Sequence, residues 1–348
     1  MPEVERDRPL RVLAVSNMYP TAENPTYGGF VATQMEAIAR AGVHVEVEFL
    51  NGRRSIWEYA AGVPRVRRLA GSGCFDLVHA HYGLCGFICS FQPLPLVVSY
   101  WGDDLLGTPN GWGGITPKSR LVLWMSLAAA YRADAMNCES EEMRSRLPAS
   151  VDRAITHVIP NGVNAALFSP GSREAARLRL GLSSTERLIL FPNTPTERRK
   201  RLDLAQAALQ ILNSGGIDAR LWIVQKVPPK DMPDYFRAAN CLLLTSDWEG
   251  SPNVVKEAMS CDLPVVSVDA GDVRWLVGLT SGSVLVERDP AAIAQGLRQV
   301  LTDPGHVDGQ RVRQELAIDG IAGRIIGVYR DIVARKAMRN HAGRQRAT

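Results

Sequence analysis

Short apolar runs that end at polar residues recur along this chain, separated by segments with helical spacing, and this alternation limits the fold more than any other feature. The first run, LRVLAVSN at 10–17, is rich in Val and Leu and has the length of a buried strand. A segment with Val31, Met35 and Ile38 at helical spacing follows, and VHVEVEFL at 43–50 then alternates as a strand. This β-loop-α-β start predicts a parallel sheet covered by helices.

The same alternation continues through the first half and begins again in the second. Each expected strand is short, apolar and followed by polar or helical sequence, as in doubly wound sheets. Further strands are expected at 75–81, 95–102 and 134–140, then at 187–193, 219–225, 241–246 and 263–269. The pattern predicts an α/β protein with two Rossmann-like, doubly wound domains.

A break in the pattern divides the chain. Strand and helix signals fade at 157–182, where Pro and Gly cluster, and 348 residues suffice for two domains of ordinary size. We expect an N-terminal domain at 1–165, a C-terminal domain at 166–320, and a terminal helix with a basic tail at 321–348.

Glycine placement argues against a dinucleotide cofactor. Neither half carries G-x-G-x-x-G after its first strand, since the first loop has only Gly28 and Gly29 and the second has no glycine before Lys200. The close approach of backbone to a pyrophosphate requires those glycines. A nicotinamide or flavin enzyme is therefore disfavoured.

Composition and cysteine usage are those of a soluble cytoplasmic protein. The chain is 46% hydrophobic and 22% charged, and its six cysteines show no CxxC or zinc spacing, as for free thiols in a reducing compartment. The N-terminus lacks the apolar core of a signal peptide, and the most apolar helix, at 121–133, is too short to span a bilayer. We expect a cytoplasmic protein without a nucleic-acid partner; the basic C-terminal end leaves a weak peripheral membrane contact open.

The segment DWEGSPNVVKEAMSCDLPVV, at 247–266, carries the densest functional signal. The preceding strand ends at Ser246, and ligands of open α/β sheets bind at the carboxyl ends of strands. Ser251 suits an N-cap and Pro252 the first helical position, which predicts a helix from 252 to about 260. Its first turn offers free backbone N–H groups, and these predict an anion site.

Two carboxylates flank this helix start. Glu249 lies just upstream, and Glu257 lies further along the helix, placed to accept hydrogen bonds from vicinal hydroxyls. An arbitrary glutamate is most often a solvated surface carboxylate. The combination of strand end, glycine, cap, proline and two carboxylates favours a binding site.

These segments resemble the family-4 retaining glycosyltransferases of the GT-B fold, whose Glu-x7-Glu signature is written near E-G-x-P-N-V-x-x-E-A-x-A-C-G-x-P-V-V. The resemblance covers most of the chain, because DLVHAHYG (76–83), VVSYWGDDL (97–105), VIPNGVNAALFSP (158–170) and GDVRWLV (271–277) fall in the family's order. It implies two Rossmann-like domains facing an inter-domain cleft, and a final helix, at about 318–337, that crosses back to the N-terminal domain.

The resemblance also implies roles for single residues. Glu249 would contact hydroxyls of the transferred sugar, and Glu257 would hold the ribose. The family's diphosphate-binding arginine and lysine look like Arg198 and Lys200, with Arg199 and Arg201 as alternatives for the arginine. The backbone near the donor phosphate and sugar completes the donor set: Gly28, Gly29, Gly250, Ser251, Pro252, Asn253 and Val254.

Three further residues are assigned to the acceptor or sugar side: His81, Trp101 and Asp104. Trp101 stands where many relatives have histidine, so a histidine contact to the donor sugar is lost or replaced by stacking. Asp104 and the adjacent Asp103 are more typical of loop or capping carboxylates than of metal ligands. His79 and His81 share a strand face without a third ligand. We therefore expect no metal and no other cofactor.

The sequence thus predicts a retaining, metal-independent glycosyltransferase that moves a sugar from a nucleotide-sugar donor to an acceptor hydroxyl. A cation pair and a helix N-terminus would stabilise the charge that grows on the leaving nucleoside diphosphate. The sugar, the base and the acceptor, whether saccharide, lipid-linked saccharide or small molecule, stay open. Two alternatives of the same fold also stay open: a pseudo-glycosyltransferase and a non-catalytic nucleotide-sugar-binding protein.

Overall fold

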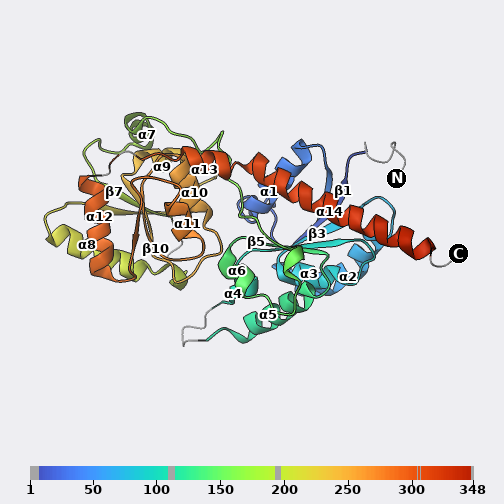
Figure 1. The fold of residues 1–348 in the computed structure, drawn as a ribbon. Helices are drawn as coiled ribbons and strands as arrows, with labels where there is room; N and C mark the ends of the chain where they lie inside the picture. Colours follow the sequence, from blue (N-terminus) through green and yellow to red (C-terminus); the bar gives the residue numbers. More distant parts are fainter. Residues whose placement is uncertain (1–7, 109–113, 193–196, 304, 306, 346–348) are drawn as a thin grey trace. The chain divides into compact units, whose positions relative to one another are not determined.

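The computed structural model describes residues 8–108, 114–192, 197–303, 305 and 307–345, with backbone alone from 340 onward (Figure 1). The chain forms two compact units, one of Met1–Pro160 with Asp319–Thr348 and the other of Asn161–Ile318. Residues 161–165 belong to the second unit because Val163 pairs with Ala317 through a parallel bridge. The division therefore falls slightly before the position that the Pro- and Gly-rich stretch indicates.

The first unit is built on a six-stranded sheet in the order β2-β1-β3-β4-β5-β6, and every neighbouring pair is parallel. The strands are β1 (Arg11–Ser16), β2 (His44–Phe49), β3 (Leu77–His81), β4 (Leu96–Tyr100), β5 (Ala135–Cys138) and β6 (Thr156–Val158). Central strands such as β3 and β4 are buried along their whole length, which explains their continuous apolar runs. The predicted parallel sheet is confirmed.

Helices cover this sheet: α1 (Gly29–Arg40), α2 (Trp57–Ala70), α3 (Gly83–Cys89), α4 (Asp103–Leu106), α5 (Pro117–Ala130), α6 (Glu141–Ser145) and most of α14 (Ile318–Gln345). Side-chain caps set some of their starts: Thr116 accepts from the Ser119 N–H ahead of α5, with Pro117 at the first helical position. The Tyr329 hydroxyl of α14 lies 2.6 Å from Nδ1 of the buried His79, so α14 is anchored to the first unit's sheet.

The second unit has a five-stranded sheet in the order β11-β10-β9-β7-β8, again with parallel pairs. Its strands are β7 (Leu188–Pro192), β8 (Arg220–Val224), β9 (Cys241–Leu244), β10 (Val265–Val268) and β11 (Val284–Val286). Its helices are α7 (Arg173–Leu180), α8 (Leu202–Ser214), α9 (Met232–Ala238), α10 (Asn253–Ser260), α11 (Val273–Val277), α12 (Pro290–Thr302) and α13 (Gln310–Glu315). Figure 1 shows α8 and α12 on one face of this sheet and α9, α10 and α11 on the other.

The core of the second unit lies between the sheet and the pair α8 and α12. Leu212 of α8 and Leu297 of α12 meet strand residues such as Ile189 and Val266 there, all fully buried. Each such side chain contributes about 1.5–3 kcal/mol through burial. Between β8 and β9 the chain forms one helix, α9, and no further strand.

Candidate functional site

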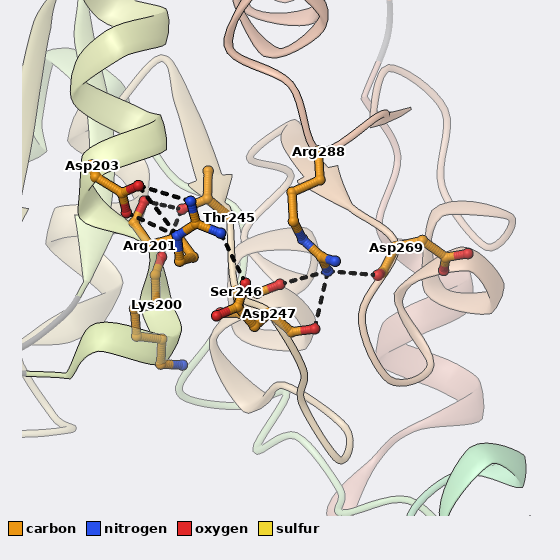
Figure 2. Close-up of polar contacts among 8 residues, drawn as sticks. All are labelled: Lys200, Arg201, Asp203, Thr245, Ser246, Asp247, Asp269 and Arg288. Atoms are coloured by element: carbon orange, nitrogen blue, oxygen red, sulfur yellow. Dashed lines mark hydrogen bonds and ion pairs between the residues drawn. The ribbon is translucent and has the colours of Figure 1, made fainter. Parts of the chain in front are cut away.

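The topology of the second sheet marks one edge as the place for a ligand. β7 and β9 are neighbours, but the chain continues from β7 to β8 on one side of this pair and from β9 to β10 on the other. The loops that leave β7 and β9 therefore run in opposite directions from the strands' carboxyl ends. The loop after β7 contains the 3-10 turn Arg198–Lys200. The Thr245 hydroxyl, just past β9, donates to the carbonyl oxygens of Lys200 (2.7 Å) and Arg201 (3.1 Å), which ties the two loops together (Figure 2).

A buried carboxylate lies where these loops meet. Glu249 Oε1 accepts from Lys200 Nζ (2.6 Å) and the Ser246 hydroxyl (2.7 Å), and its Oε2 accepts from Arg199 Nη1 (3.0 Å). Burial opposes ionisation, but the charges of Lys200 and Arg199, helped by the hydrogen bonds, lower the pKa of Glu249 below its usual value. The carboxylate is therefore ionised and compensated by two cations.

The structure brings Lys200 to Glu249 but leaves Arg198 exposed and outside this cluster. Arg199, which the sequence leaves as an alternative, points to Glu249 instead, and its guanidinium also lies 4.9 Å from the ring centroid of Trp248. The tight 3-10 turn causes this selection, because only some of three consecutive side chains can face the same loop.

Two further arginines connect the segments around the site through ion pairs and hydrogen bonds (Figure 2). Arg201 has a left-handed φ of 53° and pairs with Asp203 (2.8 Å) and Asp247 (3.1 Å). Arg288 donates from Nη2 to the carbonyl oxygens of Ser246 (2.9 Å), Asp247 (3.0 Å) and Asp269 (3.3 Å). Arg288 thus joins the segments that follow β9 and β10. Nothing in its local sequence points to this role.

The helix that follows Glu249 starts one residue later than predicted. α10 begins at Asn253 with Pro252 at the N-cap position, and Ser251 makes no cap, so the predicted start is wrong. The Ser251 hydroxyl instead donates to Asp272 Oδ2 (2.5 Å) and accepts from Lys256 Nζ (2.9 Å). α10 has no side-chain cap and no acidic residue in its first turn, so its N-terminal N–H groups are available for an anion.

Lys256 is a fully buried lysine that sequence reasoning missed. Its ammonium donates to the Asn161 carbonyl oxygen (2.9 Å) and to Ser251, and so connects the first residues of the unit with the loop before α10. Burial raises the pKa of Asp272 above its usual value, against the opposing charge of Lys256 and the hydrogen bond from Ser251. The available signal was a lysine on the apolar face of α10, beside Val255 and Met259.

Glu257 lies on the same helix and is half-buried. Burial raises the pKa of its carboxyl to about 7, with the charge of Lys256 acting in the opposite direction. Among the residues that the structure describes, none hydrogen-bonds this carboxylate. Glu257 thus has free acceptor capacity.

A pocket of about 310 Å³ lies beside the cations at the carboxyl ends of β7 and β8. Arg199 and Lys200 line one part, and Val224, Gln225 and Lys226 line another. The pocket therefore combines positive charge at the Glu249 end with a mixed polar and apolar wall after β8.

In the first unit, Gly28 and Gly29 end the loop that connects β1 to α1. Gly28 has a φ of 68°, and a Cβ there would lie 2.3 Å from the Met18 carbonyl carbon. A Cβ on Gly29 would meet no atom within 4 Å. Gly28 is thus required by the backbone, and Gly29 leaves open space at the start of α1.

Asp104 is fully buried and binds backbone. Its carboxylate accepts from the N–H groups of Gly83 (2.9 Å), Trp101 (3.0 Å) and Gly102 (2.9 Å). Burial and the neighbouring Asp103 raise its pKa to about 7, although these hydrogen bonds act in the opposite direction. These contacts are those of a capping carboxylate.

His81 and Trp101 stack at an interplanar angle of 22°, with 5.7 Å between ring centroids. Burial, together with the nearby His79, lowers the pKa of His81 well below its usual value, so the ring is neutral. His79 is held by Ser99 and Tyr329. Within the described residues, no group of three or more His, Cys, Asp or Glu side chains is arranged to hold a metal ion.

Comparison with known proteins agrees with this arrangement. The family model described as Glycosyltransferase Family 4 matches residues 11–167, and the model described as Glycosyl transferases group 1 matches residues 187–303. D-inositol 3-phosphate glycosyltransferase 1 of Catenulispora acidiphila is 27% identical over 331 residues, which span 80% of this chain and 77% of the relative. The D-inositol 3-phosphate glycosyltransferase of Xylanimonas cellulosilytica is 27% identical over 335 residues, spanning 81% and 78%.

Solved structures share the fold. Sucrose-phosphate synthase of Thermosynechococcus elongatus has a TM-score of 0.76 at 19% identity, covering 94% of this chain and 100% of that one. Anabaena HepE, solved in complex with UDP and glucose, has a TM-score of 0.68 at 17% identity, covering 92% and 100%.

Two doubly wound units, the second with a carboxylate, paired cations and an uncapped helix start at its switch point, define a glycosyltransferase of the GT-B fold. The chain belongs to glycosyltransferase family 4. The fold and the enzyme class expected from the resemblance are thereby confirmed.

Proposed function

We propose that the second unit binds a uridine-diphosphate sugar and transfers the sugar with retention and without a metal ion. The contact of Lys200 and Arg199 with Glu249, directly before the uncapped start of α10, carries this proposal. It is supported by the crystal structures of HepE with UDP and with UDP-glucose, because HepE has the same fold.

The chemistry follows from the charges. When the bond between the sugar and the diphosphate breaks, its electron pair stays on the phosphate oxygen. Lys200, Arg199 and the α10 N–H groups stabilise the negative charge that develops there. The acceptor oxygen bonds to the sugar carbon on the same face, and its proton passes to the leaving phosphate. Glu249, relieved of its cations by the diphosphate, is then free to bind sugar hydroxyls. Glu257 accepts hydrogen bonds from the ribose.

The acceptor belongs, in this proposal, to the first unit. A pocket of about 610 Å³ there is lined by Tyr27, Tyr59 and Tyr82 together with Arg53 and Lys118. Aromatic faces suit a sugar or cyclitol ring, and the two cations suit a phosphate. Relatives named D-inositol 3-phosphate glycosyltransferases support a hydroxyl-rich acceptor that carries phosphate.

A cytoplasmic location is also proposed. All six cysteines are free and five of them are buried, which fits a reducing compartment. No helix in the described part of the chain has the length and apolar character needed to cross a bilayer.

Four substitutions test the donor site. Lys200→Ala and Arg199→Ala should each lower transfer from a labelled UDP-sugar by roughly 10²–10³-fold, since each removes charge stabilisation from the leaving group. Glu249→Ala should abolish transfer. Arg198→Ala is the matched comparison, because it removes the same kind of charge from the same turn but outside the cluster.

Thermal unfolding of each variant checks that the fold is intact, and calorimetry measures UDP binding. Full turnover in Lys200→Ala would overturn the donor assignment. A larger loss of transfer activity in Arg198→Ala than in Arg199→Ala would assign the phosphate contact to Arg198 instead of Arg199. UDP-sugar binding without turnover over a broad acceptor panel would identify a binding protein instead of an enzyme.

A further inference from the structure

Helix α5 exposes two of its large apolar side chains, Leu121 and Trp124, which is unusual for a helix of a water-soluble domain. Its buried positions are the small residues Ser119, Ser126, Ala129 and Ala130, and the half-buried Leu127 also packs against the core of the first unit. A Cβ on Gly83 of α3 would meet the Ser126 side chain at 2.1 Å, so the two helices approach closely there. A surface helix normally buries its large apolar residues and exposes its polar ones.

The outward face of α5 carries an apolar stripe. Leu121 and Trp124 are 54% and 59% exposed, and Ala128 and Tyr131 continue the same stripe at helical spacing. Trp124 is held by Phe87 of α3, with 5.8 Å between the ring centroids. Trp124 therefore keeps a contact within the first unit while much of its side chain is exposed.

A second exposed apolar group lies at the start of α2, beside the same pocket of the first unit that α5 lines. Ile56 and Trp57, at the start of α2, are 72% and 76% exposed. Ile56 lines the same 610 Å³ pocket as Val122 of α5. The start of α2 and helix α5 thus both contribute to the lining of one pocket, and each also carries exposed apolar side chains. We call these exposed side chains the apolar rim: Ile56, Trp57, Phe91, Leu121, Trp124 and Tyr131.

Most of the charged residues around the apolar rim are basic, although Asp103 also lines the pocket. α5 contains no Asp or Glu; Lys118 and Arg120 are exposed near its start, and Arg132 is exposed just after its end. Arg53 and Arg54 are exposed two to three residues before Ile56. The acidic residue next to Trp57, Glu58, is paired with Arg65 at 3.3 Å. Tryptophan and leucine combined with Lys and Arg match the interface of an anionic bilayer, where aromatic rings lie at headgroup depth and cations meet lipid phosphates.

We propose that the apolar rim lies in the interfacial layer of an anionic lipid membrane, and that the pocket between its two parts opens onto the bilayer surface. A lipid whose headgroup carries phosphate and hydroxyls would then present its headgroup to Arg53 and Lys118 while its acyl chains stay in the membrane. This second statement rests on the proposed function; the membrane contact does not.

The experiment uses the full chain and sedimentation with vesicles, in the absence of any UDP-sugar. One set of vesicles contains phosphatidylcholine alone, and the other contains equal parts of phosphatidylcholine and phosphatidylglycerol. We expect binding to the anionic vesicles that weakens with added salt, with a blue shift of tryptophan emission. The double variant Leu121→Gln with Trp124→Gln should lose at least about tenfold in affinity, because two large side chains no longer enter the interface.

The matched control is Leu178→Gln with Trp275→Gln, which removes the same residue types from exposed positions of the second unit. The control should keep wild-type binding to vesicles. Absence of binding to both vesicle types, or an equal loss in both double variants, overturns the proposal. So does a dimer in solution that the Leu121→Gln with Trp124→Gln variant dissociates, since the apolar rim would then be a protein interface.

Transfer to a soluble sugar phosphate, measured separately, distinguishes the two proposals. Transfer without vesicle binding removes the membrane contact and leaves the enzyme assignment intact. Vesicle binding without transfer to soluble or vesicle-borne acceptors removes the enzyme assignment and leaves the membrane contact intact.

Discussion

Lys256 is the residue whose surroundings differ most from those that its type favours. It is fully buried, and its ammonium is held by the Asn161 carbonyl, by Ser251 and by the charge of Asp272. We predict that Lys256→Met lowers the free energy of unfolding by about 3 kcal/mol, because removing one partner of a buried charge network leaves the others unpaired. Urea denaturation measures this. The double variant Lys256→Met with Asp272→Asn should recover part of the loss, and an unchanged single variant would contradict the prediction.

Asp104, also at the residue scale, predicts a pH dependence. The folded-state pKa of about 7 lies above the unfolded value of about 4, so the folded protein binds the proton more tightly. This contribution to stability is complete at low pH and is lost as pH rises from about 4 to about 7. Asp104→Asn removes the titratable group. It also replaces one accepting oxygen by an amide NH₂, which cannot accept from a backbone N–H, and this costs about 1–3 kcal/mol of unfolding free energy.

The measurement is thermal or urea unfolding of both proteins across this pH range. The stability advantage of the wild type over Asp104→Asn should be larger near pH 4 than near pH 8. A difference that is independent of pH would mean that Asp104 does not titrate in this range.

At the scale of elements, the turn between β1 and α1 contains two adjacent glycines, of which the first has no room for a side chain and the second does. Gly28→Ala places a Cβ 2.3 Å from the Met18 carbonyl carbon in a left-handed conformation, and should cost more than about 1 kcal/mol of unfolding free energy. Gly29→Ala places its Cβ in open space at the start of α1 and should be neutral or stabilising. Circular dichroism melts of the two variants compare them directly, and equal effects would contradict the backbone argument.

At the scale of the whole molecule, the two units should respond differently to the donor. UDP at 100 times its dissociation constant should stabilise the protein by about 2.7 kcal/mol through mass action. Hydrogen exchange should slow at residues 197–203 and 246–257 of the second unit, where the cations and the α10 start lie. Protection confined to the first unit would place the nucleotide there instead.

Much of the fold was predictable because local periodicity reflects burial directly. The central strands are buried on both faces and read as continuous apolar runs, as at 77–81 and 96–100. β11 was missed because its residues are only half-buried and give a weak signal. Glu249 and Lys200, which the structure brings into contact, could be proposed from the sequence because a motif after a strand end marks Glu249 and the family resemblance marks Lys200. Arg288 was missed because its partners are backbone carbonyls distant in sequence.

By itself, the sequence determined the α/β class, the two-part organisation and the family, since these depend on local apolar spacing and on a contiguous motif. Only the tertiary structure decided that Arg199 and not Arg198 faces Glu249, that Ser251 contacts Lys256 instead of capping α10, and that α5 exposes Leu121 and Trp124. The physical reason is common to all three. Each depends on which side chain meets which across distant segments, and sequence spacing alone does not specify such contacts.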